Sequence, residues 1–182
     1  FQYSDTKIIT PTKIYDPNNE FDEEYFEFGL FMSRREYKVI NRRLQRGRLM
    51  SVNEGKYVGS VAPFGYDRVK IKGDKGYTLK KNQEANTVKI MYDLYAYDDL
   101  SLNEITAKLN EMGLKPRKSE EWSVSTVKDI LANPVYIGKI KWNARKEVKV
   151  YKHEKLVKTR PRNSDYILVE GLHKAIIDEK TW

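Results

Sequence analysis

A long segment without proline, residues 18–62, limits what this chain can fold into more than any other feature of its sequence. Apolar side chains recur along it at three- and four-residue steps or multiples of these, which is the period of a helix. The members of this series are Phe21, Tyr25, Phe28, Met32, Val39 and Leu44. We therefore predict one helix over residues 21–50, about 45 Å long at roughly 1.5 Å per residue. Since such a length is unusual inside a compact domain, we expect the helix to connect two bodies.

Charge changes sign along the same segment. Residues 1–33 carry a net charge of −5 and residues 34–48 a net charge of +6, so the acidic start and basic end of the predicted helix suit its dipole. The rest of the chain adds +7, mostly within residues 139–162. The 182 residues together reach +8, and an excess of this size indicates a polyanionic partner.

Composition and motifs exclude several classes of protein. The chain has no cysteine, so disulfides, thiolate zinc sites and a cysteine nucleophile are ruled out. No apolar run reaches the length of a membrane span, and we expect no membrane partner. P-loop, Gly-x-Gly-x-x-Gly and nucleophile-elbow patterns are missing. A cluster of acids fits partners of the helix dipole better than metal ligands: Asp22, Glu23, Glu24 and Glu27. We therefore predict no catalytic residue, no metal and no cofactor in this chain.

Shorter elements follow the long helix. A glycine-rich linker leads to two strand-like stretches around a turn at residues 72–75, which predicts a hairpin. Three shorter helices are expected over residues 83–97, 101–112 and 123–132, the second opened by a capping box of Ser101 and Glu104. Beyond them, three stretches alternate like strands of one antiparallel sheet: residues 136–142, 147–151 and 165–170.

These elements predict an α+β fold. It would consist of a long N-terminal connecting helix, a helical DNA-binding domain with a helix-turn-helix-like pair, and a small antiparallel β-sheet. We expect the chain to divide into residues 1–50, a linker over residues 51–65, and a domain over residues 66–182.

The helix pair 101–112 and 123–132 resembles a helix-turn-helix. In that motif, polar residues near the start of the second helix reach base edges in the major groove. The candidates for this contact are Ser123, Ser125, Thr126 and Lys128. The connector, residues 113–122, is long for the tight motif, so an ordinary helical hairpin with a solvated outer face stays the slightly better interpretation of the spacing alone.

The basic part of the long helix offers candidate phosphate contacts. Arg42, Arg43, Arg46 and Arg48 could follow a DNA backbone or enter a narrow minor groove. The alternative is a solvated face that pairs with the acidic start of the helix. Because bases outnumber acids on this segment, we favour nucleic acid.

Two further pairs complete the candidate site. Lys56 and Tyr57 lie between glycines, which permit close backbone approach to a groove, although a flexible connector has the same composition. Lys141 and Arg145 belong to the second basic patch and are candidates for phosphate contact, with edge-strand charges against aggregation as the alternative.

Taken together, the segments resemble a known family. After the helix ending in Arg46-Gly47-Arg48 come GKYVGSVAPFGY, LSLNEITAKLNEMGLKPR and EWSVSTVKDILANPVYIGKI. This order is similar to that of the large serine recombinases, the serine integrases and related transposases. The most specific part is W-S-x-S-T-V-x-x-I-L-x-N-P-x-Y-x-G at residues 122–138, and the resemblance covers roughly residues 10–182.

The resemblance implies a function. Members of this family cut DNA through a serine of a resolvase-like domain, form a 5′-phosphoserine linkage, exchange strands within a tetramer, and use neither ATP nor an active-site metal. It implies that residues 1–50 hold the tail of that domain and its long helix, that the nucleophile lies upstream of Phe1, and that the zinc ribbon, which needs cysteines, is left off. The expected partners are double-stranded DNA and, in the full-length protein, copies of itself as a homo-dimer or tetramer. The expected location is the cytoplasm, for a bacterial or phage-encoded protein that is associated with DNA.

Two other function classes remain open at this point. One is a non-enzymatic winged helix-turn-helix transcription regulator that dimerises through its N-terminal helix. The other is a protein-interaction module that self-associates through the long helix without binding DNA.

Overall fold

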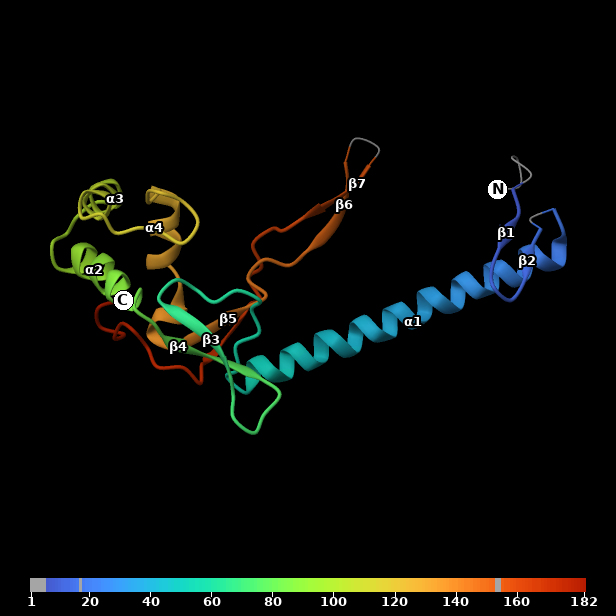
Figure 1. Ribbon diagram of the computed structural model, residues 1–182, viewed down its shortest axis with the longest axis horizontal. Helices are drawn as coiled ribbons and strands as arrows, with labels where there is room; N and C mark the ends of the chain where they lie inside the picture. Colours follow the sequence, from blue (N-terminus) through green and yellow to red (C-terminus); the bar gives the residue numbers. More distant parts are fainter. Residues whose placement is uncertain (1–5, 17, 153–154) are drawn as a thin grey trace. The chain divides into compact units, whose positions relative to one another are not determined.

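The computed structural model describes residues 6–16, 18–152 and 155–182 (Figure 1). By its internal contacts the chain forms two compact units, Phe1–Arg48 and Leu49–Trp182. The three-part division expected from the sequence stays a prediction. The predicted fold class is confirmed, because a long N-terminal helix, three shorter helices and small antiparallel sheets are all present. Within the described residues, no helix combines the length and the apolar character needed to cross a membrane.

The first unit consists of a small hairpin and most of a long helix. Strands β1 (Ile8–Ile9) and β2 (Ile14–Tyr15) pair in antiparallel fashion, where the sequence indicated one short strand. Helix α1 runs from Glu20 to Asn53, a length of 34 residues, so the predicted helix is confirmed and extended at both ends. The hairpin packs on its first turns, where Tyr15 stacks on Tyr25 with ring centroids 6.0 Å apart.

The end of α1 belongs to the second unit and is held by several hydrogen bonds. The backbone N–H of Gly55 donates to the Val52 carbonyl at 2.8 Å, and the N–H of Lys56 donates to the Ser51 carbonyl at 2.9 Å. This pair of bonds is a Schellman motif, which requires the left-handed φ of +71° at Gly55. The Gly55 carbonyl accepts from Leu172 N–H at 2.9 Å, and Val52 is fully buried. The last turn of α1 is therefore fixed to its own unit.

Three helices share the core of the second unit. They are α2 (Ala85–Ala96), α3 (Leu102–Glu111) and α4 (Val124–Leu131), and each contacts the other two. Their inward side chains Val88, Ile105, Leu109 and Val127 have no exposed surface. The predicted capping box is confirmed, since Ser101 accepts from Glu104 N–H and the Glu104 carboxylate accepts from Ser101 N–H. These contacts confirm the apolar period and caps in the sequence.

A β-hairpin and a short 3₁₀ turn close this core. Strands β3 (Tyr66–Lys70) and β4 (Tyr77–Lys81) form the predicted hairpin. The turn η2 (Pro134–Ile137) contributes Tyr136, whose hydroxyl donates to the Phe64 carbonyl at 2.9 Å. Tyr66 donates to the Lys174 carbonyl at 2.9 Å, and burial raises the pKa of Tyr66 to about 12. The hydroxyls of these two tyrosines are thus satisfied by loop carbonyls, which ties the connecting segments to the core.

The remaining strands form two separate ladders. Strand β5 (Lys139–Trp142) pairs with β8 (Ile167–Glu170), and β6 (Val148–Lys152) pairs with β7 (Lys155–Thr159). The prediction of a single sheet of three strands is wrong in two respects. It lacks β7, in which apolar and polar residues alternate only weakly. It also joins strands of two separate ladders, because β5 pairs with β8 and the hairpin of β6 and β7 lies between them in the sequence.

Candidate nucleic-acid interface

The four candidate residues of α4 lie together at the start of the helix. Ser123 is the N-cap, and its side chain accepts from Thr126 N–H. The hydroxyl oxygens of Ser123 and Thr126 are 2.8 Å apart, and those of Ser123 and Ser125 are 3.1 Å apart. All three side chains and Lys128 are exposed, while Val127 is buried. One face of α4 therefore anchors the helix and the other presents hydroxyls and a cation.

The long connector before α4 is held by two side chains that the sequence analysis did not single out for this role. Asn110, on α3, accepts from Trp122 N–H at 2.8 Å and donates to the Trp122 carbonyl at 3.3 Å. The Trp122 indole N–H donates to the Leu114 carbonyl at 2.8 Å, and its ring packs edge-on against Phe64 with centroids 5.0 Å apart. The ten-residue connector thus positions α4, because both of its ends are fixed by these contacts.

A cleft of about 390 Å³ runs beside α4, between this helix, the connector and the end of the linker. Thr126, Asp129 and Asn133 line it from one side, and Ala62 and Phe64 from the other. The cleft brings the linker end next to the exposed face of α4. Polar groups of the candidate helix and the path of the linker are therefore parts of one surface.

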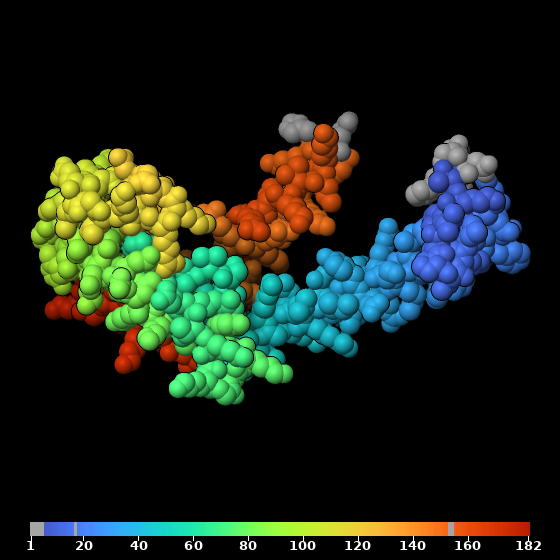
Figure 2. Space-filling view, in the orientation of Figure 1, coloured from blue at the N-terminus to red at the C-terminus, as the bar shows by residue number. Residues whose placement is uncertain are grey.

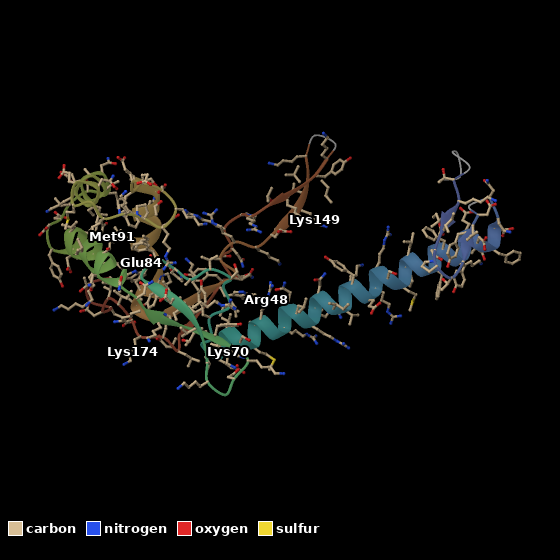
Figure 3. All side chains as sticks on the ribbon, viewed as in Figure 1. Arg48, Lys70, Glu84, Met91, Lys149 and Lys174 are labelled. Carbon is tan, nitrogen blue, oxygen red and sulfur yellow. The ribbon has the colours of Figure 1, made fainter. Side chains whose placement is uncertain are left out.

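Arg117 fastens the linker end to this surface. Its Nε donates to the Glu84 carboxylate at 2.7 Å, while its terminal nitrogens donate to the carbonyls of Ala62 at 2.9 Å and Tyr66 at 2.8 Å. Glu84, labelled in Figure 3, also accepts from Gly65 N–H at 2.9 Å. Partial burial opposes the charge on Glu84, but the hydrogen bonds from Arg117 and Gly65 outweigh it and lower the pKa of this carboxyl. Sequence reasoning missed the pair because its members lie on different elements.

In the linker, Lys56 and Tyr57 are held by internal contacts. The Lys56 ammonium lies 2.6 Å from both Glu54 and Asp74, and its side chain is only 15% exposed. Gly76 leaves room for it, since a Cβ there would lie 2.5 Å from the Lys56 side chain. The Tyr57 hydroxyl donates to the Val61 carbonyl at 2.5 Å. Both side chains shape the linker, and neither projects a free polar group from it.

The four arginines of α1 are placed differently. Arg42, Arg43 and Arg46 fall within about 100° of one another around the helix axis, and Arg48 lies on another side. All four are exposed. Among the residues that the structure describes, none of them lies within ion-pair distance of a carboxylate. Their charge is therefore not neutralised by the described part of the chain.

The last two candidates lie in the C-terminal part of the second unit. The Lys141 ammonium, on β5, is 4.6 Å from the centre of the Tyr166 ring, a cation–π contact. Arg145 forms an isolated bridge with Arg162 at the base of the β6–β7 ladder. Both side chains are exposed. The twelve candidates thus fall into four groups: one on α1, one in the linker, one on α4 and one among the C-terminal strands.

Two comparisons with known proteins bear on this surface. Residues 82–182 match the protein family described as Recombinase. The fold is similar to that in a crystal structure of an LSR–DNA complex, LSR denoting large serine recombinase, with a TM-score of 0.52 and 21% sequence identity. This likeness covers 76% of the chain described here and 35% of the other, so this chain spans about a third of the length of that protein.

Proposed function

Because the chain belongs to the Recombinase family, we propose that it is a DNA-binding part of a site-specific serine recombinase. The observation that carries this proposal is the start of α4. There, Ser125, Thr126 and Lys128 are exposed on a helix whose opposite face is anchored by Val127 and Ile130. An exposed polar helix start on a rigid support is the arrangement that reads base edges in the major groove.

The other groups have separate tasks in this proposal. Arg42, Arg43, Arg46 and Arg48 supply phosphate and minor-groove contacts, since the described structure leaves their charge without an acidic partner. Lys141 and Arg145 add phosphate contacts from the C-terminal strands. For Lys56 and Tyr57, whose polar groups are held internally, we assign the role of keeping the linker in the shape that approaches DNA.

Cleavage and assembly belong to the whole protein. By resemblance, strand cleavage there uses a serine nucleophile, and no residue of this chain is assigned to it. We propose that copies of the whole protein pair through α1, whose apolar side chains are largely exposed. Phe21 is 82% exposed, Phe28 63% and Leu44 56%. This function implies that the whole protein is encoded by a bacterium or a phage and acts on DNA. The match over residues 82–182 favours the recombinase function over that of a transcription regulator.

The experiment is a salt titration of duplex binding by the 182-residue chain, followed by fluorescence anisotropy. Arg46→Ala should weaken binding to every duplex alike and reduce the slope of log K against log salt by about 1. Ser125→Ala should leave that slope unchanged and reduce discrimination between sites, by up to about 1–3 kcal/mol for one base interaction. Asn86→Ala, an exposed polar residue on α2, is the matched control and should change neither. Binding by the unmodified chain that does not respond to salt would overturn the proposal.

A further inference from the structure

The ribbon of β6 and β7 is an unusual element within its unit. Its two strands pair with each other over five residues on each strand, from Val148 opposite Thr159 to Lys152 opposite Lys155. Figure 2 shows the side chains of this ribbon, in orange, open to solvent on the face in view. Tyr151 is 71% exposed, Leu156 61% and Val157 41%. An isolated two-stranded ribbon is marginal in water, so its own packing does not account for its presence.

Like charges lie directly opposite each other along this ribbon. The register pairs Lys149 with Lys158 and Lys152 with Lys155, and Arg145 forms a bridge with Arg162 just before the strands begin. Like charges in opposite positions destabilise an antiparallel pair. Protection of strand edges against aggregation does not require this arrangement, because lysines opposite glutamates would protect as well and would attract each other.

One acid offsets part of this repulsion. The Glu147 carboxylate lies 3.1 Å from the Lys158 ammonium and 3.4 Å from a terminal nitrogen of Arg160. Hydrogen bonds from these two bases lower the pKa of Glu147. Lys149, labelled in Figure 3, has no carboxylate within ion-pair distance in the described part of the chain. Its charge therefore repels Lys158 across the ribbon, and the ion pair of Glu147 with Lys158 offsets part of that repulsion.

The two faces of the ribbon differ. Side chains alternate along a strand, so Lys149 and Lys158 share one face with Tyr151 and Leu156. Val150 and Val157 share the other face with the second opposed lysine pair, Lys152 and Lys155. The first face therefore combines a pair of cations near the base with an exposed aromatic and an exposed aliphatic side chain nearer the tip. Phosphates and the apolar edges of sugars and bases require that combination of contacts.

We infer that the β6–β7 ribbon is a second duplex-DNA-binding element, separate from α4, whose opposed lysines contact phosphates on the two sides of a groove. This inference rests on the proposed function. A two-stranded ribbon fits the major groove of B-DNA. Phosphates between opposed lysines convert their repulsion into attraction, so a bound duplex would stabilise the ribbon that it contacts. The like-charge pairs then lower the stability of the ribbon in the free protein, and DNA binding removes this loss.

The test uses a substitution that favours the fold and opposes DNA. Lys149→Glu places an acid opposite Lys158, so the thermal stability of the 182-residue chain should stay level or rise. Binding to a random-sequence duplex of about 30 base pairs, roughly three helical turns, should weaken. The slope of log K against log salt should fall by about 1 for each phosphate that the variant no longer neutralises. Lys149→Ala removes the cation without adding a negative charge and should weaken binding less, in the same direction.

Lys89→Glu on α2 is the matched control. Lys89 is exposed. It also repels another lysine, because burial and the charges of Lys89 and Lys174 lower the pKa of Lys81. The substitution makes the same change in net charge and also relieves repulsion, on a surface outside every candidate DNA contact. Its effect on duplex binding should be several-fold smaller than that of Lys149→Glu.

The other outcomes separate the ribbon from the general proposal. Equal losses of affinity from Lys89→Glu and Lys149→Glu would mean a net-charge effect and would overturn the inference. The inference would also be overturned if Lys149→Glu left duplex affinity unchanged but altered self-association in light scattering. That result would show that the ribbon contacts a second copy of the chain. An equal loss of affinity for a single-stranded oligonucleotide of the same length would overturn the assignment to duplex DNA. If the unmodified chain itself fails to bind duplex, the proposed function fails; if Arg46→Ala weakens binding and Lys149→Glu does not, the ribbon inference alone fails.

Discussion

Helix α1 and the three helices α2–α4 have similar apolar periods, but their apolar side chains differ in burial. In the trio, the periodic side chains are buried, and Val88, Ile105 and Val127 have no exposed surface. Along α1 they stay largely in solvent, and only Val52 is buried. A helical period therefore establishes the helix but not the partner that covers its apolar face. In α1, the acidic residues of the first turn and the Schellman motif at the end support the helix, whereas the trio is supported by its shared core.

The largest expected effect tests this contrast directly. Trp122→Ala removes a ring that is 4% exposed and should lower the free energy of unfolding by about 3–5 kcal/mol. Phe28→Ala, at a position that is 63% exposed, should change it by less than about 0.5 kcal/mol. Urea unfolding followed by circular dichroism at low protein concentration measures both. A comparable loss of stability from Phe28→Ala would show that α1 is packed in solution and would break the comparison.

The next effect compares arginines with different surroundings. Arg117 donates to Glu84 and to two backbone carbonyls, and its side chain is 33% exposed. Arg117→Ala should therefore cost about 2 kcal/mol of unfolding free energy, the range for hydrogen bonds to charged groups. The exposed Arg42 on α1 should cost less than about 0.5 kcal/mol when truncated.

A double-mutant cycle sharpens this result. If Arg117 stabilises the fold through its ion pair with Glu84, the losses of unfolding free energy from Arg117→Ala and Glu84→Gln will not be additive. The coupling energy should be about 0.5–3 kcal/mol. Additive losses of stability would mean that Arg117 stabilises the linker through the carbonyls alone.

A pH effect on stability is expected from a buried histidine of the second unit. His173 is 7% exposed, and its Nε2–H donates to the Val135 carbonyl at 2.8 Å. Burial lowers the pKa of His173 from 6.5, although the hydrogen bond opposes this shift. Below pH 6.5 the unfolded chain takes up a proton that the folded chain resists. Stability is therefore full above that pH and should fall, by at most about 1.4 kcal/mol per pH unit, until the folded pKa is reached.

His173→Phe is the control for this pH dependence. It should lower stability by removing the hydrogen bond to Val135, and it should flatten the pH dependence of stability below about pH 6.5. Urea midpoints measured across this range would decide the matter. An unchanged slope in the variant would assign the effect to other groups.

The smallest effects on stability come from two serines, one on α4 and one on α1, and they should have opposite signs. Ser123 caps α4, and Ser123→Ala should cost about 1 kcal/mol. Ser33, in the middle of α1, donates to the Gly29 carbonyl at 2.9 Å, a bond within the helix that slightly disfavours it. Ser33→Ala should be neutral or stabilising by a few tenths of a kcal/mol, because alanine is the better helix former. Thermal melts of the two variants compare them.

Local patterns predicted more of this molecule than long-range ones. The helices of the core and their caps are signalled by residues a few positions apart, and Ser101 with Glu104 behaves as expected. The clamp of Arg117 on Glu84 joins residues 33 positions apart, and no spacing rule reports it. For the same reason, the sequence marked Lys56 as a cation without showing that Asp74 would neutralise it. The start of α4 was predictable because a helix cap and its exposed neighbours are one local unit.

The Schellman end of α1 has a practical consequence. The boundary between the two compact units falls between Arg48 and Leu49, inside a continuous hydrogen-bonded helix. Proteases require an extended, mobile backbone, so limited digestion should spare this boundary, although the contacts divide the chain there. A recombinant fragment beginning at Leu49 would leave the N–H groups of a single remaining turn without partners. A fragment that retains several turns of α1 before Leu49 is the better unit to express, because it keeps Val52 and Gly55 within an intact helix end.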